Sequence, residues 1–518
     1  MNEQIRPSRA GGRAARRAAR AAPLTQDLRA IRPGMESAVL NPLTEAEMDK
    51  IHDAALRCLE EIGLADAPMS GVEVMVKAGA ILGDDGRLRY PRAVVEDALA
   101  KAARKITLCG RDPAHDMELS GARVHYGTAG AAVHMVNLDG SEYRDSTIQD
   151  LRDAAHLTEQ LDNIHFLQRP MVARDIADNR EMDINTVYAC ASGTQKHIGT
   201  SITDPSHVPG ILELVHMIAG GEAAWRERPY ISNSNCFVVP PMKFATESCE
   251  VMEACIRGGM PVLLLSAGMA GATAPSTLAG AIVQATAECL AGLVYVNAIA
   301  HGHPAIFGTW PFGLDLRTGA MSIGSGEQAL LTSGCAQMHR YYDLPGGAAG
   351  GASDSKLPDM QAGWEQMCSN VMAGLSGCNM VYEAAGMHAS LLGFCHESLV
   401  LGNDLVGQAL RCVRGIEVSE DALAVETIRA TVLGPDGSGG PGHYLGTDQT
   451  LSRMQRDFVY PELGDRTSPK EWAENDKPDL LETAKRRTAE LLAAPRPAAF
   501  DSALDARIRE RFAIHLPA

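Results

Sequence analysis

Short apolar runs alternate with longer amphipathic segments from about residue 122 to residue 414, and this pattern predicts strands that are each followed by a helix. Most of the runs lack strict apolar–polar alternation, as expected for strands covered on both faces. The expected strands are Val124–Gly127, Ile164–Arg169, His197–Ser201, Tyr230–Asn235, Val262–Ser266, Ala305–Trp310, Gly347–Asp354 and Met380–Ala384. The expected helices are Thr147–Gln160, Asp178–Ser192, Pro205–Ala219, Ala245–Arg257, Ser276–Ala300, Gly326–Tyr342, Pro358–Ser376 and Asp404–Arg414.

Eight strands, each followed by a helix, fit a (β/α)₈ barrel, the TIM barrel. The competing architecture, an open doubly wound sheet, carries a glycine-rich phosphate loop after its first strand. Residues 125–130 read His-Tyr-Gly-Thr-Ala-Gly and match that fingerprint poorly. We therefore predict an α/β fold with a barrel over residues 121–415.

Two regions flank the predicted barrel. Residues 41–120 have the pattern of a small N-terminal helical region, in which Thr44 and Glu47 have the spacing of a capping box at the start of a helix. That helix is expected over Glu45–Ile62. The C-terminal extension, residues 416–518, is predicted to be helical and irregular.

Residues 1–40 are predicted to be a basic flexible tail. The first 22 residues hold six arginines among alanine and glycine, against the single acid Glu3. Such a segment is either an unstructured tail or a contact for an acidic partner. Because the whole chain has a net charge of −17, the remainder is more acidic than this figure indicates.

Composition excludes several functional classes. Hydrophobic residues make up 45% of the chain, which is too many for a disordered protein. The net charge of −17 argues against a nucleic-acid partner, because phosphate binding needs lysine and arginine. Aromatic residues make up only 5%, which argues against a base-stacking platform.

Membrane and disulfide patterns are missing from the sequence. The longest uncharged run, residues 258–287, is densely apolar only at Val262–Leu265, so we expect no membrane span and no membrane partner. The twelve cysteines show no C-x-x-C spacing and are expected to be reduced thiols. With no signal peptide visible, the expected location is the cytoplasm.

The chemistry of a TIM barrel gathers at the C-terminal ends of its strands. The sequence shows no catalytic Ser/His/Asp set, no H-E-x-x-H motif and no cluster of metal ligands, so no metal site is predicted. Lys356 is a candidate for a Schiff base, although a charge partner or a solvated side chain is the simpler interpretation. The residues expected at the strand ends are Tyr126, Gln168, Arg169, His197, Thr200, Ser201, Asn233, Asn235, Ser266, Trp310, Phe312, Ser353, Asp354 and Glu383.

This lining is polar and aromatic, and it suits a compact cation. Aromatic faces attract a quaternary ammonium by about 0.5–2 kcal/mol per contact. The alternative is that Trp310 and Phe312 only pack in their loop. Two glycine-rich tracts, residues 267–275 and 346–356, also fall at strand ends, where small residues permit close approach of a large flat ligand or form tight turns.

Several tracts occur in a characteristic order. They are Met269–Pro275 with Thr277–Gly280, Asp315–Gly319, Ser353–Lys356 with Asp359 and Gln361–Gly363, and Arg414–Val418. Together they resemble the trimethylamine methyltransferase family over roughly residues 40–490. The resemblance implies a (β/α)₈ barrel that moves a methyl group from a methylated amine to the Co(I) corrinoid, a cobalamin, of a small partner protein. It also implies that the corrinoid is carried by that protein or bound transiently, and that the chain forms a homo-oligomer.

One departure from the family pattern bears on the substrate. Founding members carry pyrrolysine in the glycine-rich tract before the Ser/Thr-Asp, whereas this chain has ordinary residues at 350–352. The family resemblance therefore points away from trimethylamine and towards a quaternary amine, with glycine betaine as the model substrate. Such a donor leaves as a neutral tertiary amine, so the reaction needs no general acid–base pair.

For a quaternary-amine donor, we assign each candidate residue a role as a hypothesis. Trp310, Phe312 and Tyr126 are expected to surround the ammonium, and Glu383 or Asp354 to balance its charge as the catalytic carboxylate. A carboxylate on the donor is expected to bind Arg169, His197, Asn233 or Asn235. The corrinoid is expected to face Gly271, Gly350, Gly351 and Ser353. A Schiff-base lyase that uses Lys356 and a non-catalytic betaine-binding barrel stay open as alternatives.

Overall fold

The computed structural model describes residues 25, 28–434 and 436–517. Eight parallel strands follow one another in the order β6-β17-β16-β13-β12-β11-β10-β9. A parallel bridge between Gly127 and Phe166 joins β6 to β9 and closes the barrel. The strands are β6 (Arg123–Tyr126), β9 (Phe166–Gln168), β10 (His197–Thr200), β11 (Ile231–Asn233), β12 (Val262–Ser266), β13 (Ala305–Thr309), β16 (Gly346–Ala349) and β17 (Met380–Tyr382).

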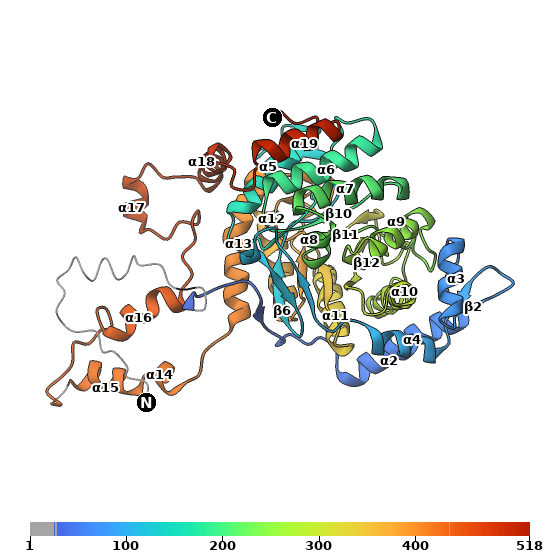
Figure 1. The fold of residues 1–518 in the computed structure, drawn as a ribbon. Coiled ribbons are helices and arrows are strands. Elements are labelled where there is room, and N and C mark those ends of the chain that lie inside the picture. The colour runs from blue at the N-terminus through green and yellow to red at the C-terminus, as the bar shows by residue number, and fades with distance from the viewer. Residues whose placement is uncertain (1–24, 26–27, 435, 518) are drawn as a thin grey trace.

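A helix follows each strand, as the alternation predicts, and the barrel fold is confirmed (Figure 1). Two boundaries differ from the prediction by more than three residues. The strand that begins at Gly346 ends at Ala349, because the chain turns there towards α12, and α13 begins at His396 rather than at Asp404. The helices are α5 (Ile148–Gln160), α6 (Asn179–Gly193), α7 (Val208–Ala219) with α8 (Glu222–Glu227), α9 (Thr246–Arg257), α10 (Leu278–Ile299), α11 (Gly326–Tyr341), α12 (Met360–Leu375) and α13 (His396–Arg414).

The N-terminal region packs on the barrel through α10. Its first helix starts with the predicted capping box, in which Glu47 Oε2 accepts hydrogen bonds from the backbone N–H and the hydroxyl of Thr44. By length and composition α10 alone, within the part of the chain described, is apolar enough to cross a membrane, but 83% of its apolar window is buried. The elements of the region are α2 (Glu45–Arg57), η2 (Cys58–Ile62), α3 (Met69–Lys77), β2 (Ile81–Leu82), β3 (Leu88–Arg89), α4 (Arg92–Lys101), β4 (Ile106–Leu108) and β5 (Met117–Leu119).

Part of the segment predicted as a tail contacts the barrel. Strand β1 (Met35–Glu36) pairs antiparallel with Val124 and Arg123, at the N-terminal end of β6. The predicted basic segment itself, residues 1–24, lies outside the described residues.

The loops after β6 and β17 form a small four-stranded sheet, which therefore lies at the C-terminal end of the barrel. Its order is β18-β19-β7-β8. Backbone bonds from Ser353 to Met387 and from Ala389 to Ser355 tie it to the loop after β16. Strands this short show no readable apolar period, and the sequence pattern did not predict them. They are β7 (His134–Val136), β8 (Tyr143–Asp145), β18 (Met387–His388) and β19 (Gly393–Phe394), and a separate hairpin is β14 (Leu314–Asp315) with β15 (Ala320–Met321).

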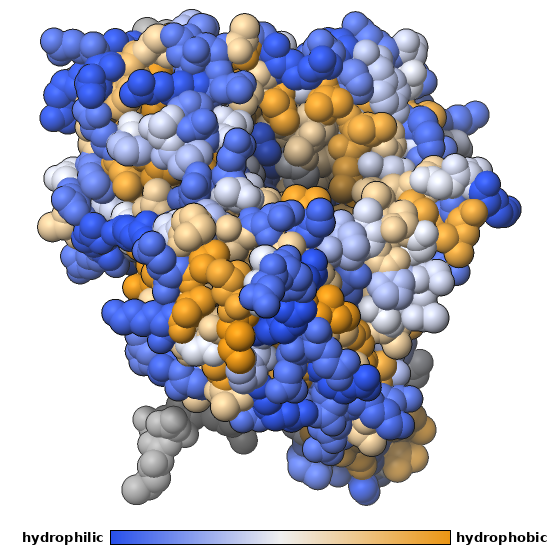
Figure 2. Space-filling view, turned by 90° about the vertical axis from the view of Figure 1, so that its right-hand side faces the viewer, coloured by the Kyte–Doolittle hydropathy of each residue, from blue (hydrophilic) through white to orange (hydrophobic). Residues whose placement is uncertain are grey.

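The C-terminal extension leaves the barrel and returns to it (Figure 1). Helices α18 and α19 pack on the outer helices, whereas four short helices between α13 and α18 stand apart from the barrel. On the face that carries α3 and β2, hydrophobic and hydrophilic residues are interspersed around a hollow in the upper half (Figure 2). The helices are α14 (Glu420–Leu423), α15 (Val425–Leu433), α16 (Asp448–Asp457), α17 (Pro469–Glu474), α18 (Leu480–Ala493) and α19 (Ser502–Arg511).

Candidate active site

Three aromatic rings meet at the barrel: Trp310 and Tyr382 lie at the C-terminal ends of β13 and β17, and Phe166 begins β9. The rings of Trp310 and Tyr382 lie 4.7 Å apart, centroid to centroid, and Phe166 meets Tyr382 edge to face at 5.1 Å. Trp310 follows β13, and its indole N–H donates to the carbonyl of Gly347 at 3.1 Å. This bond fixes the plane of the indole. The structure therefore places Trp310 in an aromatic cluster, as an aromatic cation site requires.

Glu383 directly follows Tyr382 at the end of β17, and its carboxylate is buried without a partner. The side chain exposes 1% of its surface, and Oε2 has no hydrogen-bond partner in the described part of the chain. Burial alone raises the pKa of this carboxyl to about 8. The residue also has a left-handed backbone, with φ of 63°, which costs roughly 1–3 kcal/mol for a non-glycine residue. A strained backbone and a buried carboxyl without a partner, in one residue, mark a functional position.

Arg169 directly follows β9. Of the four predicted anion-binding residues, all of them described, it alone has a buried side-chain atom without a partner. Its Nε finds no hydrogen-bond acceptor among residues 25, 28–434 and 436–517. Burial lowers the pKa of the guanidinium. The negative charge of Asp183 in α6 raises this pKa and so opposes the effect of burial. Guanidinium groups recognise carboxylates through paired N–H donors, so Arg169 has spare capacity for an anionic group.

Gln168, which precedes Arg169, forms a polar pair with Ser234, and neither residue has a role predicted from the sequence. Gln168 donates from Nε2 to the hydroxyl of Ser234, which in turn donates to the carbonyl of Thr200 at 2.9 Å. The amide lies over Gly199, where a Cβ atom would come within 1.7 Å of Gln168 Oε1. Gln168 stood in the list of strand-end residues, but only the tertiary contacts show that it spans β9, β10 and β11.

Tyr126 and His197 are not free to bind a substrate. The Tyr126 hydroxyl donates to the carbonyl of Asn370 in α12 at 2.9 Å, so this ring faces the outer helices. Both ring nitrogens of His197 are occupied, one by the carbonyl of Cys109 at 2.9 Å and the other by the hydroxyl of Ser232 at 3.0 Å. The predictions for these two residues were wrong, because strand alternation sends Tyr126 outward and His197 begins rather than ends its strand.

The two predicted asparagines hold loops together. Asn233 donates from Nδ2 to Asn235 Oδ1 at 2.7 Å. Asn235 in turn bonds the backbone N–H and carbonyl of Ile202, at 3.0 and 2.7 Å, and so fastens the loop after β10 to β11. These contacts engage one N–H of each amide in holding the loops, and a role in binding a carboxylate stays a prediction. Phe312 pairs through its backbone with Met269 beyond the ends of β13 and β12, outside the three-ring cluster.

Asp354 and Ser353 are also committed to structure. The Asp354 carboxylate accepts from the backbone N–H groups of Ile323 and Gly324, at 3.0 and 3.1 Å, and from the hydroxyl of Ser390 at 2.7 Å. Ser353 donates to Glu365 of α12 at 2.6 Å. Asp354 joins the loop after β13 to the β18–β19 hairpin, so it positions loops rather than balancing a substrate charge, and Glu383 remains as the candidate carboxylate.

The glycines predicted to face a corrinoid separate into two groups. Gly350 and Gly351 are buried against β17 and α12, which contradicts direct contact with a large ligand. Gly271 is exposed on the loop after β12, with φ of 98°. Only Gly271 therefore remains available at the surface of the barrel mouth.

Gly351→Ala is expected to destabilise the protein by more than about 1 kcal/mol. Gly351 has φ of 84°, and a Cβ atom would lie 2.6 Å from Asn370 Nδ2 and 2.7 Å from Ala384 Cα. The matched control is Gly363→Ala in α12, where nothing lies within 4 Å and alanine is expected to stabilise the helix by roughly 0.5–1 kcal/mol. Urea unfolding of both variants measures the difference, and equal midpoints would contradict it.

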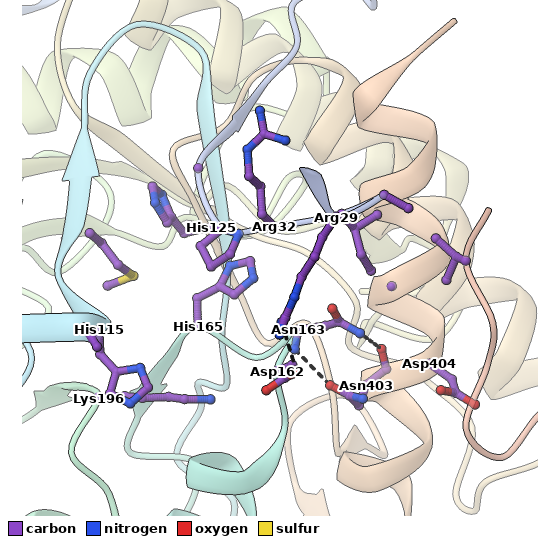
Figure 3. Close-up of a pocket in the computed structure, with 18 of the residues that line it drawn as sticks. Arg29, Arg32, His115, His125, Asp162, Asn163, His165, Lys196, Asn403 and Asp404 are labelled. Atoms are coloured by element: carbon purple, nitrogen blue, oxygen red, sulfur yellow. Dashed lines mark hydrogen bonds and ion pairs between the residues drawn. The ribbon is translucent and has the colours of Figure 1, made fainter. Parts of the chain in front are cut away.

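A large cavity lies at the other end of the barrel. Its volume is about 870 Å³, and Figure 3 shows His125 and His165 next to each other on its wall. His125 lies in β6, and His165 and Lys196 precede β9 and β10, so the cavity opens at the N-terminal ends of the strands. None of the predicted site residues lines it. It is therefore separate from the aromatic and acidic cluster at the opposite end.

The family model for trimethylamine methyltransferase (MTTB) matches residues 9–514. The chain belongs to the trimethylamine methyltransferase family. It is 30% identical to the glycine betaine methyltransferase of Desulfitobacterium hafniense strain Y51, over 90% of this chain and 96% of that protein. It is also 30% identical to the trimethylamine methyltransferase of Methanosarcina thermophila, over 88% of this chain and 93% of that protein. Among solved structures, dihydropteroate synthase from Vibrio fischeri ES114 is 10% identical, with a TM-score of 0.36, over 60% of this chain and all of that one.

As a member of this family the protein is a methyltransferase. The alternative that rests on Lys356 has no support in the site. Lys356 is exposed, and its ammonium donates to the carbonyl of Asp354 at 2.6 Å. A Schiff-base lysine needs a desolvated amine, which an exposed side chain does not provide.

Proposed function

We propose that this methyltransferase takes a methyl group from a quaternary amine of the betaine class and transfers it to the Co(I) corrinoid of a partner protein. The unpaired, buried carboxylate of Glu383 carries the proposal. A quaternary ammonium has no N–H group, so it offers a carboxylate Coulomb attraction without hydrogen bonds. A carboxylate held away from donors, beside an aromatic cluster, is complementary to such a cation.

The residues of this chain orient the donor and exclude water. A Co(I) corrinoid supplies the nucleophile that accepts the methyl group. The Trp310 and Tyr382 faces attract the methylated nitrogen, and Glu383 balances its charge. When the methyl–nitrogen bond breaks, its electron pair stays on nitrogen and the amine leaves neutral. No proton is transferred, which agrees with the absence of an acid–base pair among the described residues of the cluster.

The barrel mouth offers a surface for a corrinoid protein. Several loops that follow the strand ends, and the first turns of α12, expose large apolar side chains, which is unusual for surface that stays in water. Their exposed fractions range from 54% to 81%, at Val239, Leu316, Met360, Trp364 and Leu392. Exposed Gly271 lies against Leu316 in the same rim. These residues fit a partner that delivers a large flat acceptor to the mouth.

Arg169→Met is expected to raise KM for glycine betaine by about 10- to 100-fold, because a charged hydrogen bond contributes roughly 1.5–3 kcal/mol. The kcat at saturating donor is expected to change little, since the carboxylate does not react. Choline lacks the carboxylate and serves as the matched donor. Steady-state methyl transfer with both donors checks the result, and an equal loss with choline would contradict a carboxylate-binding role.

The direct test is a screen of methylated amines with added Co(I) corrinoid, followed by its absorbance. We expect methylation of the corrinoid with a quaternary amine and none with trimethylamine. The donors to compare are glycine betaine, carnitine, choline and trimethylamine. Methylation with trimethylamine alone would overturn the assignment to quaternary amines, and no methylation with any donor would overturn corrinoid as the acceptor.

A further inference from the structure

The cavity at the N-terminal ends of the strands is named the rear cavity here, and it has the size of a ligand site. Its volume of about 870 Å³ lies within the range of small-molecule pockets, about 300–1,000 Å³. Three parts of the chain enclose it: the barrel, the segment of residues 29–34, and residues 458–460. Methyl transfer as proposed above takes place at the opposite end of the barrel, so it gives the rear cavity no role.

His165 on the wall of the rear cavity has a buried N–H donor without a partner. The residue exposes 5% of its surface. Its Nδ1 accepts from the backbone N–H of Tyr126 at 3.1 Å, so the proton of the neutral ring is on Nε2. Nε2 has no hydrogen-bond acceptor among residues 25, 28–434 and 436–517. Because a buried donor without an acceptor is costly, a bound acceptor is expected there.

His125 presents the complementary group beside His165. The two imidazole rings meet edge to face, with centroids 6.0 Å apart (Figure 3). Nδ1 of His125 lies 3.2 Å from the carbonyl of Asn379, which can only accept, so Nδ1 carries the proton and Nε2 holds a lone pair. Burial lowers the pKa of His125 to about 4, so the ring is neutral at neutral pH. A ligand at the two rings therefore meets one donor and one acceptor.

Lys196 adds a buried positive charge to the same wall. Its ammonium donates to three backbone carbonyls, at 2.7, 2.8 and 2.6 Å, and the last of them belongs to Ile164, directly before His165. In the part of the chain that the structure describes, its hydrogen bonds reach no carboxylate. Burial lowers the pKa of Lys196 to about 8, so the ammonium is still mostly charged at neutral pH. This charge favours an anion in the rear cavity.

The acidic residues around the rear cavity are already engaged by other groups, so they do not cancel this preference. Arg29 is the loosest of their partners, since 3.7 Å separates it from Asp162 and their side chains are 49% and 86% exposed. Such a pair contributes little, and Arg29 is available to a ligand. The ion pairs are Asp116–Arg228, Glu118–Lys105, Asp162–Arg29 and Glu462–Arg487, while Glu159 and Asp404 accept hydrogen bonds from neighbouring loops.

We propose that the rear cavity binds a small oxyanion that keeps an O–H group at neutral pH, such as hydrogen phosphate or bicarbonate. One oxygen of the anion accepts from Nε2 of His165, and its O–H donates to Nε2 of His125. Lys196 and Arg29 balance the charge. An oxyanion without a proton leaves the lone pair of His125 without a donor and binds more weakly. The site is separate from the aromatic cluster and does not depend on the identity of the methyl donor.

Isothermal titration of the full chain with inorganic phosphate, bicarbonate and sulfate tests this site. Phosphate or bicarbonate is expected to bind at least about tenfold more tightly than sulfate, which carries no proton at neutral pH. His165→Asn is expected to weaken binding by about 10- to 100-fold. Asparagine offers Oδ1 as an acceptor for the Tyr126 N–H, but it has no donor at the position of Nε2.

A second pair of variants tests the charge at the opening of the cavity. Arg29→Met is expected to weaken binding by about two- to fivefold, as for an exposed ion pair. The matched control is Arg57→Met on α2, where the arginine side chain is 71% exposed and pairs with Glu61. This control is expected to bind the anion like the wild type.

Three results would overturn the proposed site. They are no binding of phosphate or bicarbonate at millimolar concentration, sulfate binding as tightly as both, and full affinity in a folded His165→Asn variant. If His165→Asn does not fold, Arg29→Met decides in its place. An affinity equal to that of Arg57→Met then contradicts an anion in the rear cavity.

Discussion

Glu383→Gln is expected to reduce methyl transfer from a quaternary amine by about 100- to 1,000-fold, because removing one member of a buried ion pair costs roughly 3–5 kcal/mol. The substitution keeps the shape of the side chain, so the loss reports its charge. The loss is expected in kcat/KM for every quaternary donor, with or without a carboxylate, which separates Glu383 from Arg169.

The same variant is expected to be more stable than the wild type, increasingly so as pH rises. The pKa of Glu383 is about 8 in the folded protein against an ordinary value of 4.5. Between these values the folded state holds a proton that the unfolded state has lost, so this residue lowers stability by about 1.4 kcal/mol per pH unit across that window. Glutamine does not titrate and removes the effect.

Unfolding measured from pH 5 to pH 9 checks this expectation. The stability difference between Glu383→Gln and wild type is expected to widen up to about pH 8. Glu288→Gln is the matched control, since the buried Glu288 carboxylate is already bonded by Met242 N–H at 2.8 Å and Ser266 at 2.5 Å. Burial also raises the pKa of Glu288, but these hydrogen bonds oppose the rise. The control is therefore expected to keep its methyl transfer and to gain less stability with rising pH than Glu383→Gln. A pH-independent difference for Glu383→Gln would show that the carboxyl is not held protonated by burial.

Trp310→Ala is expected to lower kcat/KM for a quaternary amine by about tenfold or more, since each cation–π contact contributes roughly 0.5–2 kcal/mol and the lost ring also admits water. Trp310 exposes only 6% of its surface, so alanine also leaves a cavity and lowers stability. Trp310→Phe retains an aromatic face and is expected to recover part of the activity.

Tyr126→Phe separates the two aromatic positions. The Tyr126 hydroxyl donates to the carbonyl of Asn370 in α12 and does not face the aromatic cluster. The Tyr126→Phe variant is therefore expected to lose some stability and to keep methyl transfer. Rates for the three variants with glycine betaine, alongside circular dichroism, make the comparison. Unchanged turnover in Trp310→Ala, or a large loss in Tyr126→Phe, would remove the aromatic cluster from the proposed mechanism.

Much of the architecture follows from local patterns. Alternating apolar runs and amphipathic segments predicted all eight barrel strands, because strands buried on both faces and helices with one apolar face differ in period. The capping box at Thr44 is equally local. The short strands β7, β8, β18 and β19 were missed, because two or three residues are too few to define a period.

The sequence by itself determined the barrel, the family resemblance and the residues that follow each strand, Trp310 and Glu383 among them. Only the tertiary structure decided which of those residues are free. It turned Tyr126 outward and engaged His197, Asp354 and the two asparagines. It left Oε2 of Glu383 without a hydrogen-bond partner among the described residues. The physical reason is that side-chain direction depends on strand register to a single residue, and that hydrogen-bond partners come from segments far apart in the chain.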